Sequence, residues 1–201
     1  MRAAALHAQE FARSGVDQSG DKQEVPADPV IFTKSPSSLA DPFQKIAASA
    51  DPTQTVDYEG ELGVVIARRC KDVKRDAALD HVFAYTIVND VTARAVQQRH
   101  KQWFLGKSLD TFCPVGPWLV TRDEFGVPDE QELATYVNGE RRQLAKLRDM
   151  GFPHITRGDR ASVRSARGSV KLFLPSSMSL GCRINLISRG PSGDAPNSSP
   201  P

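Results

Sequence analysis

Two glutamates two residues apart stand at the head of an apolar run, in Tyr58-Glu59-Gly60-Glu61-Leu62-Gly63-Val64-Val65-Ile66. The aliphatic, β-branched character of the run predicts a strand, and side chains at i and i+2 of a strand point to the same face. Two acids on one face repel each other, so a shared divalent cation is one physical reason for the pattern. An exposed edge pair is the alternative reading.

A third acid ends another β-rich run, Phe83 to Asn89, which is followed by Asp90. Three carboxylates can then converge from two strand ends. An all-oxygen ligand set favours a hard cation such as Mg²⁺, Mn²⁺ or Ca²⁺, whereas zinc or copper would draw on His or Cys. The sequence contains no CxxC, HxxxH or HExxH spacing. It therefore predicts a metal site formed by Glu59, Glu61 and Asp90.

Three segments, in this order and spacing, resemble the fumarylacetoacetate hydrolase superfamily. They are Glu59-x-Glu61, then Asn89-Asp90-Val91-Thr92-Ala93-Arg94, then the run from Gln102 to Pro117 that contains Gly106-Lys107-Ser108. The resemblance covers about residues 7 to 143. It implies a mostly β (α+β) fold, a mixed β-roll with a few short helices. It also implies Mg²⁺ or a similar ion on the three acids, 2-oxo or 2,4-dioxo acid substrates, and a homodimer.

The resemblance assigns further side chains to substrate or catalysis. Lys107 matches a family lysine beside the metal, although a lone loop lysine is usually a solvated charge. Arg94 and Gln97 resemble substrate-contacting positions, and their spacing places them on one helical face. A salt bridge or a capping contact is the alternative role for this pair.

His7 and Glu10, in His7-Ala8-Gln9-Glu10, resemble the lid dyad of the family's hydrolases. In that role the glutamate orients the imidazole, which takes a proton from water so that hydroxide attacks the distal carbonyl. An alanine-rich helix that carries one His and one Glu is otherwise commonplace.

The chain also departs from the family pattern. Ala95 follows Arg94 where the family commonly has an aspartate, which predicts that Arg94 lacks a charge partner near the helix start. The strand with an Asn-Tyr pair that usually precedes the lid is missing, and so is a Thr-Gly-Thr-Pro turn after Gln143. These departures support a second hypothesis, a truncated and inactive homologue.

Charge divides the chain into two unlike parts. Residues 1–145 hold 17 basic and 21 acidic side chains (net −4), while residues 146–201 hold 9 basic and 3 acidic (net +6). We expect an incomplete catalytic domain over 1–145 and a divergent basic region over 146–201 that ends in a disordered tail from Gly190. The basic region lacks interleaved aromatics, which disfavours nucleic-acid binding.

The remaining signals concern location and local structure. No apolar stretch approaches the roughly 20 residues needed to cross a bilayer, and three widely spaced cysteines favour a reducing cytoplasm. We expect a strand over Pro26–Pro36, a helix over Arg94–Lys101, a hairpin turn at Asn138-Gly139, and short strands near 170–174 and 182–187.

The leading functional hypothesis is a metal-dependent hydrolase that cleaves a C–C bond in an acylpyruvate or related 2,4-dioxo acid. Oxaloacetate decarboxylation and hydroxydienedioate isomerisation, which use the same metal frame in the family, are alternatives within the enzyme class.

Overall fold

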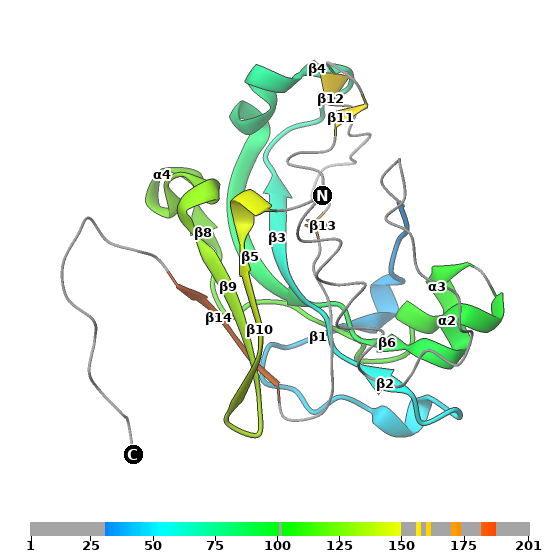
Figure 1. The fold of residues 1–201 in the computed structure, drawn as a ribbon. Coiled ribbons are helices and arrows are strands. Elements are labelled where there is room, and N and C mark those ends of the chain that lie inside the picture. The colour runs from blue at the N-terminus through cyan, green and yellow to red at the C-terminus, as the bar shows by residue number, and fades with distance from the viewer. Residues whose placement is uncertain are drawn as a thin grey trace.

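The computed structural model describes residues 31–100 and 102–149, together with short strands at 156–157, 160–161, 170–173 and 182–187. Strands dominate the described residues, with a few short helices (Figure 1). The strands are β1 Leu39–Ala40, β2 Val56–Asp57, β3 Gly60–Ile66, β4 Val73–Lys74, β5 Val82–Asn89, β6 Thr92–Ala93, β7 Cys113–Pro114, β8 Val120–Thr121, β9 Glu132–Val137, β10 Glu140–Lys146, β11 Thr156–Arg157, β12 Arg160–Ala161, β13 Val170–Phe173 and β14 Cys182–Ile187. The helices are α2 Arg94–His100, α3 Trp103–Lys107 and α4 Arg122–Phe125, with 3₁₀ turns η1 Pro36–Ser38, η2 Ala48–Ala50, η3 Arg75–His81, η4 Pro128–Glu130 and η5 Leu147–Asp149.

The central element is the antiparallel pair β3 and β5, in a four-stranded sheet of order β13-β3-β5-β8. Gly63 allows the two strands to pack closely, because a Cβ there would lie 2.7 Å from Thr86 Cγ2 and 2.9 Å from Val88 Cγ2. Leu62 and Tyr85 turn to the other face and form the main core with Phe125, Leu133 and Leu147. One face of the sheet is thus apolar, and the other is free to carry polar chemistry.

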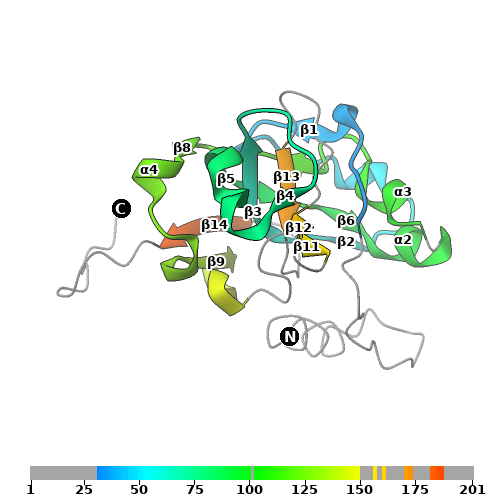
Figure 2. The same cartoon turned by 90° about the horizontal axis from the view of Figure 1, so that it is seen from above.

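A second sheet, of order β10-β9-β14, packs beside the first (Figures 1 and 2). β9 and β10 form a hairpin through Asn138 (φ 51°) and Gly139 (φ 84°), the two positive φ angles that a type I′ turn requires. This confirms the predicted turn. Smaller pairings join β1 to β7 and β2 to β6, and a three-stranded sheet has the order β11-β12-β4.

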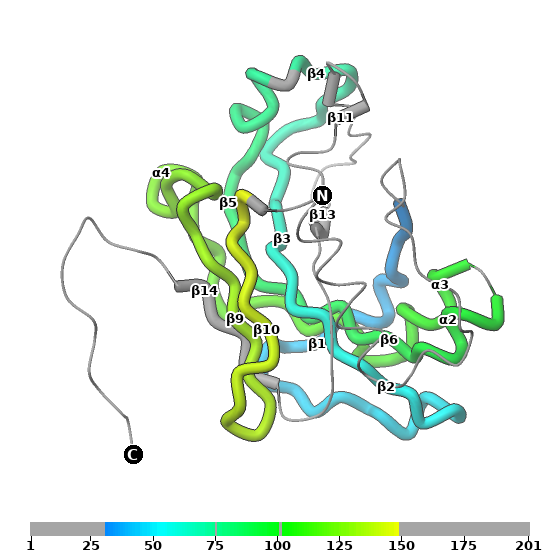
Figure 3. Tube along the Cα trace, viewed as in Figure 1, coloured from blue at the N-terminus to red at the C-terminus, as the bar shows by residue number. Residues whose placement is uncertain are grey.

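Helices α2 and α3 lie side by side at the end of the central sheet remote from α4 (Figures 1 and 2). The strand β6 leads directly into α2 and pairs with β2. A small second core of Val91, Ala93 and Phe112 fixes this corner. The chain trace shows that β2, β6 and the two helices form one compact corner (Figure 3).

The predicted fold class is confirmed, because the described residues are mostly strands with a few short helices. The helix predicted over Arg94–Lys101 is present as α2, and the strands predicted near 170 and 182 are present as β13 and β14. The division at residue 145 stays a prediction, although β13 and β14 pair with β3 and β9. The disordered tail predicted from Gly190 lies outside the described residues.

The strand predicted over Pro26–Pro36 is wrong for its described part. Residues 31–35 form no strand, and Pro36–Ser38 is the 3₁₀ turn η1. The Ser35 hydroxyl accepts a hydrogen bond from the Ser37 N–H, and Pro36 provides the fixed φ suited to the first position of a turn. The Ser35 cap and Pro36 therefore favour the 3₁₀ turn at the end of the predicted strand. Within the part of the chain that the structure describes, no helix is long and apolar enough to span a bilayer.

Candidate metal centre

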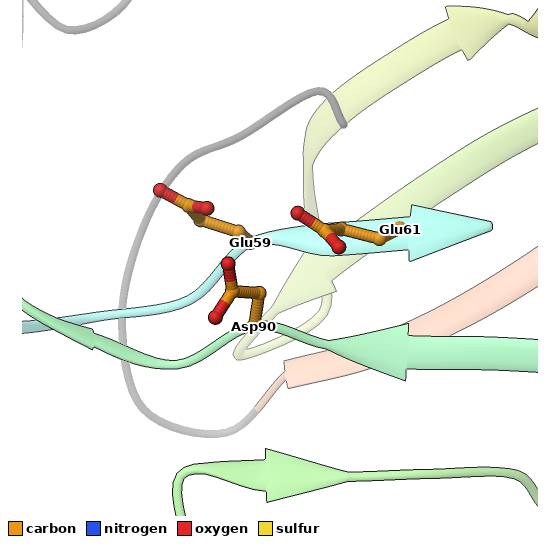
Figure 4. A group of neighbouring side chains, drawn as sticks. All are labelled: Glu59, Glu61 and Asp90. Atoms are coloured by element: carbon orange, nitrogen blue, oxygen red, sulfur yellow. The ribbon is translucent and has the colours of Figure 1, made fainter. Parts of the chain in front are cut away.

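Three carboxylates converge where β3 begins and β5 ends, as Figure 4 shows for Glu59, Glu61 and Asp90. The register that pairs Gly60 with Asn89 is extended by a hydrogen bond from the Asp90 N–H to the Glu59 carbonyl (2.8 Å). Because opposed residues of antiparallel strands share a face, Asp90 lies beside both glutamates. One oxygen from each acid lies within 4.8 Å of the others, and all three side chains are buried.

Lys107, the last residue of α3, reaches this cluster from the adjacent corner. Its ammonium donates to Glu59 Oε2 (2.7 Å), Asp90 Oδ2 (2.6 Å) and Thr92 Oγ1 (2.9 Å). The Phe32 ring lies beside the ammonium, with its centroid 4.7 Å from the nitrogen. The structure thus brings the predicted lysine into direct contact with two of the three acids, and the ammonium is almost completely buried.

Arg94 and Gln97 share the first turn of α2, and both are buried. The Arg94 guanidinium contacts Glu59 Oε1 (2.5 Å), donates to Asp57 Oδ2 through Nε (2.7 Å), and donates to Gln97 Oε1 through Nη1 (3.2 Å). The expectation that Arg94 lacks a charge partner is therefore wrong. Ala95 does remove a neighbouring acid, but Asp57 on β2 supplies the missing charge from across the β2–β6 pair.

Sequence reasoning missed two further polar side chains of this site. The Lys34 ammonium is bonded to Asp90 Oδ1 and donates to the Val91 carbonyl (3.1 Å), and it is 5 % exposed. Thr92 accepts from Lys107 and donates to the Asp90 carbonyl (3.0 Å). Lys34 stands in a segment expected to be a plain strand, so no local pattern marked it. Thr92 lies inside the Asn89 to Arg94 motif, and this position was the one sequence signal that could have identified it.

The pKa of Glu61 is strongly affected by its surroundings. Burial, followed by the charges of Asp90 and Glu59, holds the pKa of Glu61 well above its usual range. Burial also raises the pKa of Asp90, although Lys107 and Lys34 oppose that shift. Burial alone would lower the pKa of Lys107, but the charges of Glu59, Asp90 and Glu61 together outweigh it and the net shift is upward. The cluster therefore favours positive charge at its centre.

The residues present fit a divalent cation. Both oxygens of Glu61 are buried, and neither has a hydrogen-bond partner among the described residues. A buried carboxylate without a partner is costly, and a coordinated cation removes that cost. The donor set consists of carboxylate oxygens, which suit Mg²⁺, Mn²⁺ or Ca²⁺. His7 and Glu10 lie outside the described residues, so their assignment stays a prediction.

The described residues combine a mostly β fold with a buried cluster of Glu59, Glu61 and Asp90 that could hold a metal ion beside Lys107. Comparison with known families identifies the class of protein. The model of the fumarylacetoacetate (FAA) hydrolase C-terminal domain matches residues 1–156. The chain belongs to the fumarylacetoacetate hydrolase family.

Several relatives carry enzyme names. Oxaloacetate tautomerase YisK of Bacillus subtilis (strain 168) is 45% identical over 135 residues, which cover 67% of this chain and 45% of that protein. The 2,4-didehydro-3-deoxy-L-rhamnonate hydrolase of Sphingomonas sp. (strain SKA58) is 46% identical over 129 residues, 64% of this chain and 45% of that protein. The chain spans about half the length of these curated relatives.

The fold is shared with solved structures of the family. The 5-carboxymethyl-2-hydroxymuconate delta-isomerase from Mycobacterium smegmatis superposes with a TM-score of 0.67 at 36% identity, covering 83% of this chain and 67% of that one.

Proposed function

We propose that this chain carries a divalent-cation site for chemistry on 2-oxo or 2,4-dioxo acids, and that its reaction is cleavage of a C–C bond in an acylpyruvate or related acid. The observation that carries the proposal is the buried carboxylate cluster, in which Glu61 offers two oxygens without a protein partner. Glu59, Glu61 and Asp90 would hold the ion, with Mg²⁺, Mn²⁺ or Ca²⁺ as candidates. A bound dication would act as a Lewis acid on the oxygen where negative charge develops.

The chain's own residues supply the rest of the chemistry. Lys107 keeps Glu59 and Asp90 in place and contributes positive charge beside the reacting atoms. Arg94 and Gln97, linked to each other on α2, would hold a substrate carboxylate or carbonyl. His7 and Glu10 are proposed to activate water, with the imidazole taking the proton.

The proposed step balances as a hydrolysis. The hydroxyl of water adds to the distal carbonyl carbon, and the C–C bond breaks with its electron pair moving to the 2-oxo fragment as an enolate. A proton then returns to that carbon, which gives a carboxylic acid and a 2-oxo acid. The buried cluster and its bound cation would stabilise the enolate.

Keto–enol or double-bond isomerisation of a 2-oxo acid is a second candidate. It is supported by the buried carboxylate cluster and by Lys107, because stabilisation of an enolate is the main requirement of this reaction. Relatives named as a tautomerase and an isomerase support it. Decarboxylation of oxaloacetate would use the same groups.

A homodimer and a cytoplasmic location are part of the proposal for the whole protein.

Thermal unfolding with and without Mn²⁺ and oxalate, an enolate mimic, tests the site, and a screen of acylpyruvates and oxaloacetate tests the reaction. We expect a cation-dependent rise in midpoint that oxalate increases and that Glu61→Ala abolishes. Release of a carboxylic acid together with a 2-oxo acid would support hydrolysis, whereas interconversion without loss of carbon would support isomerisation. Cation binding without any turnover would support the inactive homologue.

A further inference from the structure

The start of helix α2 is held by Thr55, a residue from a different segment. The Arg94 N–H donates to the Thr55 carbonyl (3.1 Å), and the Ala95 N–H donates to the Thr55 hydroxyl (2.9 Å). The first N–H groups of a helix have no acceptor within the helix, so acceptors from outside decide where it begins. Thr55 supplies two such acceptors, one for the Arg94 N–H and one for the Ala95 N–H. The guanidinium of the same Arg94 reaches the metal centre.

Thr55 is fixed in turn by the buried carboxylate of Asp51. Its N–H donates to Asp51 Oδ2 (2.7 Å), and its hydroxyl lies 2.7 Å from the Thr53 hydroxyl. The Thr53 hydroxyl donates to Asp51 Oδ1 (2.5 Å), as does the Thr53 N–H (2.8 Å). The Thr55 hydroxyl also lies 3.4 Å from Asp51 Oδ2, so two hydroxyls connect the Ala95 N–H to the Asp51 carboxylate in one hydrogen-bond network.

The backbone of this loop is held in an uncommon conformation. Gln54 has a φ of 53°, and its N–H donates to the Asp51 carbonyl (3.3 Å). A non-glycine residue keeps a left-handed conformation only where its surroundings enforce it. Burial by itself would raise the pKa of Asp51, but the hydrogen bonds from Thr53 and Thr55 outweigh it and the net shift is downward. The carboxylate is thus ionised and fully engaged.

The same segment also supplies the charge partner of Arg94. Thr55 leads directly into β2, whose residues pair with β6 in the register Val56 with Ala93 and Asp57 with Thr92. Asp57 then accepts from Arg94 Nε. Residues 51–57 therefore fix both ends of Arg94, the backbone N–H and the guanidinium.

We propose that Asp51 and Thr55 are positioning residues that set the start of α2 and thereby aim Arg94 at the metal centre. Neither residue touches the carboxylate cluster; their effect passes through Arg94. The inference rests on the proposed function only where it assigns Arg94 to substrate binding.

Hydrogen–deuterium exchange on Thr55→Val tests the positioning without any assumption about activity. This isosteric change removes the hydroxyl acceptor and keeps the carbonyl. We expect exchange across Arg94 to Gln97 to rise about fivefold, the factor that loss of one helix cap gives, while β3 and β5 exchange as in the wild type. Thr86→Val is the matched control, because it removes another buried, hydrogen-bonded hydroxyl, the one that donates to the Trp118 carbonyl (2.7 Å). Unchanged exchange over Arg94 to Gln97, or an equal rise in the control, would overturn the proposal.

Steady-state kinetics with the dioxo acid that the wild-type chain converts supply the second readout. Thr55→Val and Asp51→Asn should raise KM by about fivefold or more with a smaller change in kcat, and Thr55→Ser should restore KM because it keeps the hydroxyl. The Mn²⁺-dependent rise in midpoint should persist in all three variants. Changes in KM and kcat in Thr86→Val that equal those in Thr55→Val would contradict the positioning role. A wild-type chain that binds Mn²⁺ and converts no dioxo acid would refute the proposed function alone, and the exchange result would still decide the positioning.

Discussion

The ammonium nitrogen of Lys107 lies 2.6 Å from Asp90 Oδ2, although the two residues come from the end of α3 and the end of β5. Both side chains are buried, so this pair is not screened as surface ion pairs are. The lysine and the acid cluster therefore depend on each other for stability.

Lys107→Met should lower the free energy of unfolding by about 3 kcal/mol when no divalent cation is added, because it leaves buried carboxylates without a counter-charge. Mn²⁺ should restore part of the loss, since a dication supplies the missing positive charge. Urea unfolding with Mn²⁺ and with a chelator measures both effects. Lys71→Met, at an exposed lysine, is the control and should change little in either condition. A loss that Mn²⁺ leaves untouched would argue against a shared site.

Glu61→Gln should cost little stability without added cation, because burial and the charges of Asp90 and Glu59 raise the pKa of this carboxyl group, which has no hydrogen-bond partner among the described residues. The same change should abolish cation-induced stabilisation. For the wild type, free cation at about 100 times its dissociation constant adds about 2.7 kcal/mol. Calorimetric titration with Mn²⁺, together with the unfolding midpoint, measures the difference. Retention of wild-type affinity by Glu61→Gln would exclude Glu61 as a ligand.

The acid cluster was predictable because its causes are local. Period-two spacing places Glu59 and Glu61 on one face, and a simple antiparallel pairing brings Asp90 beside them. The i, i+3 spacing of Arg94 and Gln97 is likewise a property of one helical turn.

The polar groups that complete the site were not predictable in this way. Lys34 reaches Asp90 from an irregular segment 56 positions away, and Asp57 reaches Arg94 only because β2 pairs with β6. These contacts depend on tertiary register, which leaves no periodic signal in one sequence. For the same reason, the residue at position 95 gives no indication that Asp57 is a charge partner of Arg94.

Gly106→Ala should displace α3 and with it Lys107. A Cβ at this position would lie 2.7 Å from the Gln97 nitrogen and 2.8 Å from the Ala93 oxygen, both backbone atoms that have little room to move. We expect a loss of about 1–3 kcal/mol in unfolding free energy, together with weaker Mn²⁺ binding. Gly139→Ala, in the β9–β10 turn, is the control, because its φ of 84° makes the substitution strained while its Cβ would meet no atom within 4 Å. Equal effects of the two variants on Mn²⁺ affinity would contradict a specific role for the α2–α3 contact.

The contribution of Asp51 should depend on pH with a defined sign. Because its pKa is lowered in the folded chain from an ordinary value of 3.8, the folded state binds fewer protons than the unfolded state near that value. Its stabilising contribution is then complete above the ordinary pKa and is lost as the pH falls through the lowered one. The stability difference between wild type and Asp51→Asn should therefore be largest at neutral pH and shrink below about pH 4.

Urea unfolding of both proteins across this pH range measures the stability difference, in which the titration of groups common to both proteins cancels. In a Thr53→Val background, which lacks one of the hydrogen bonds that lower the pKa, the pH dependence should weaken. A difference that stays constant with pH, or grows as the pH falls, would contradict an ionised Asp51 anchoring the start of α2.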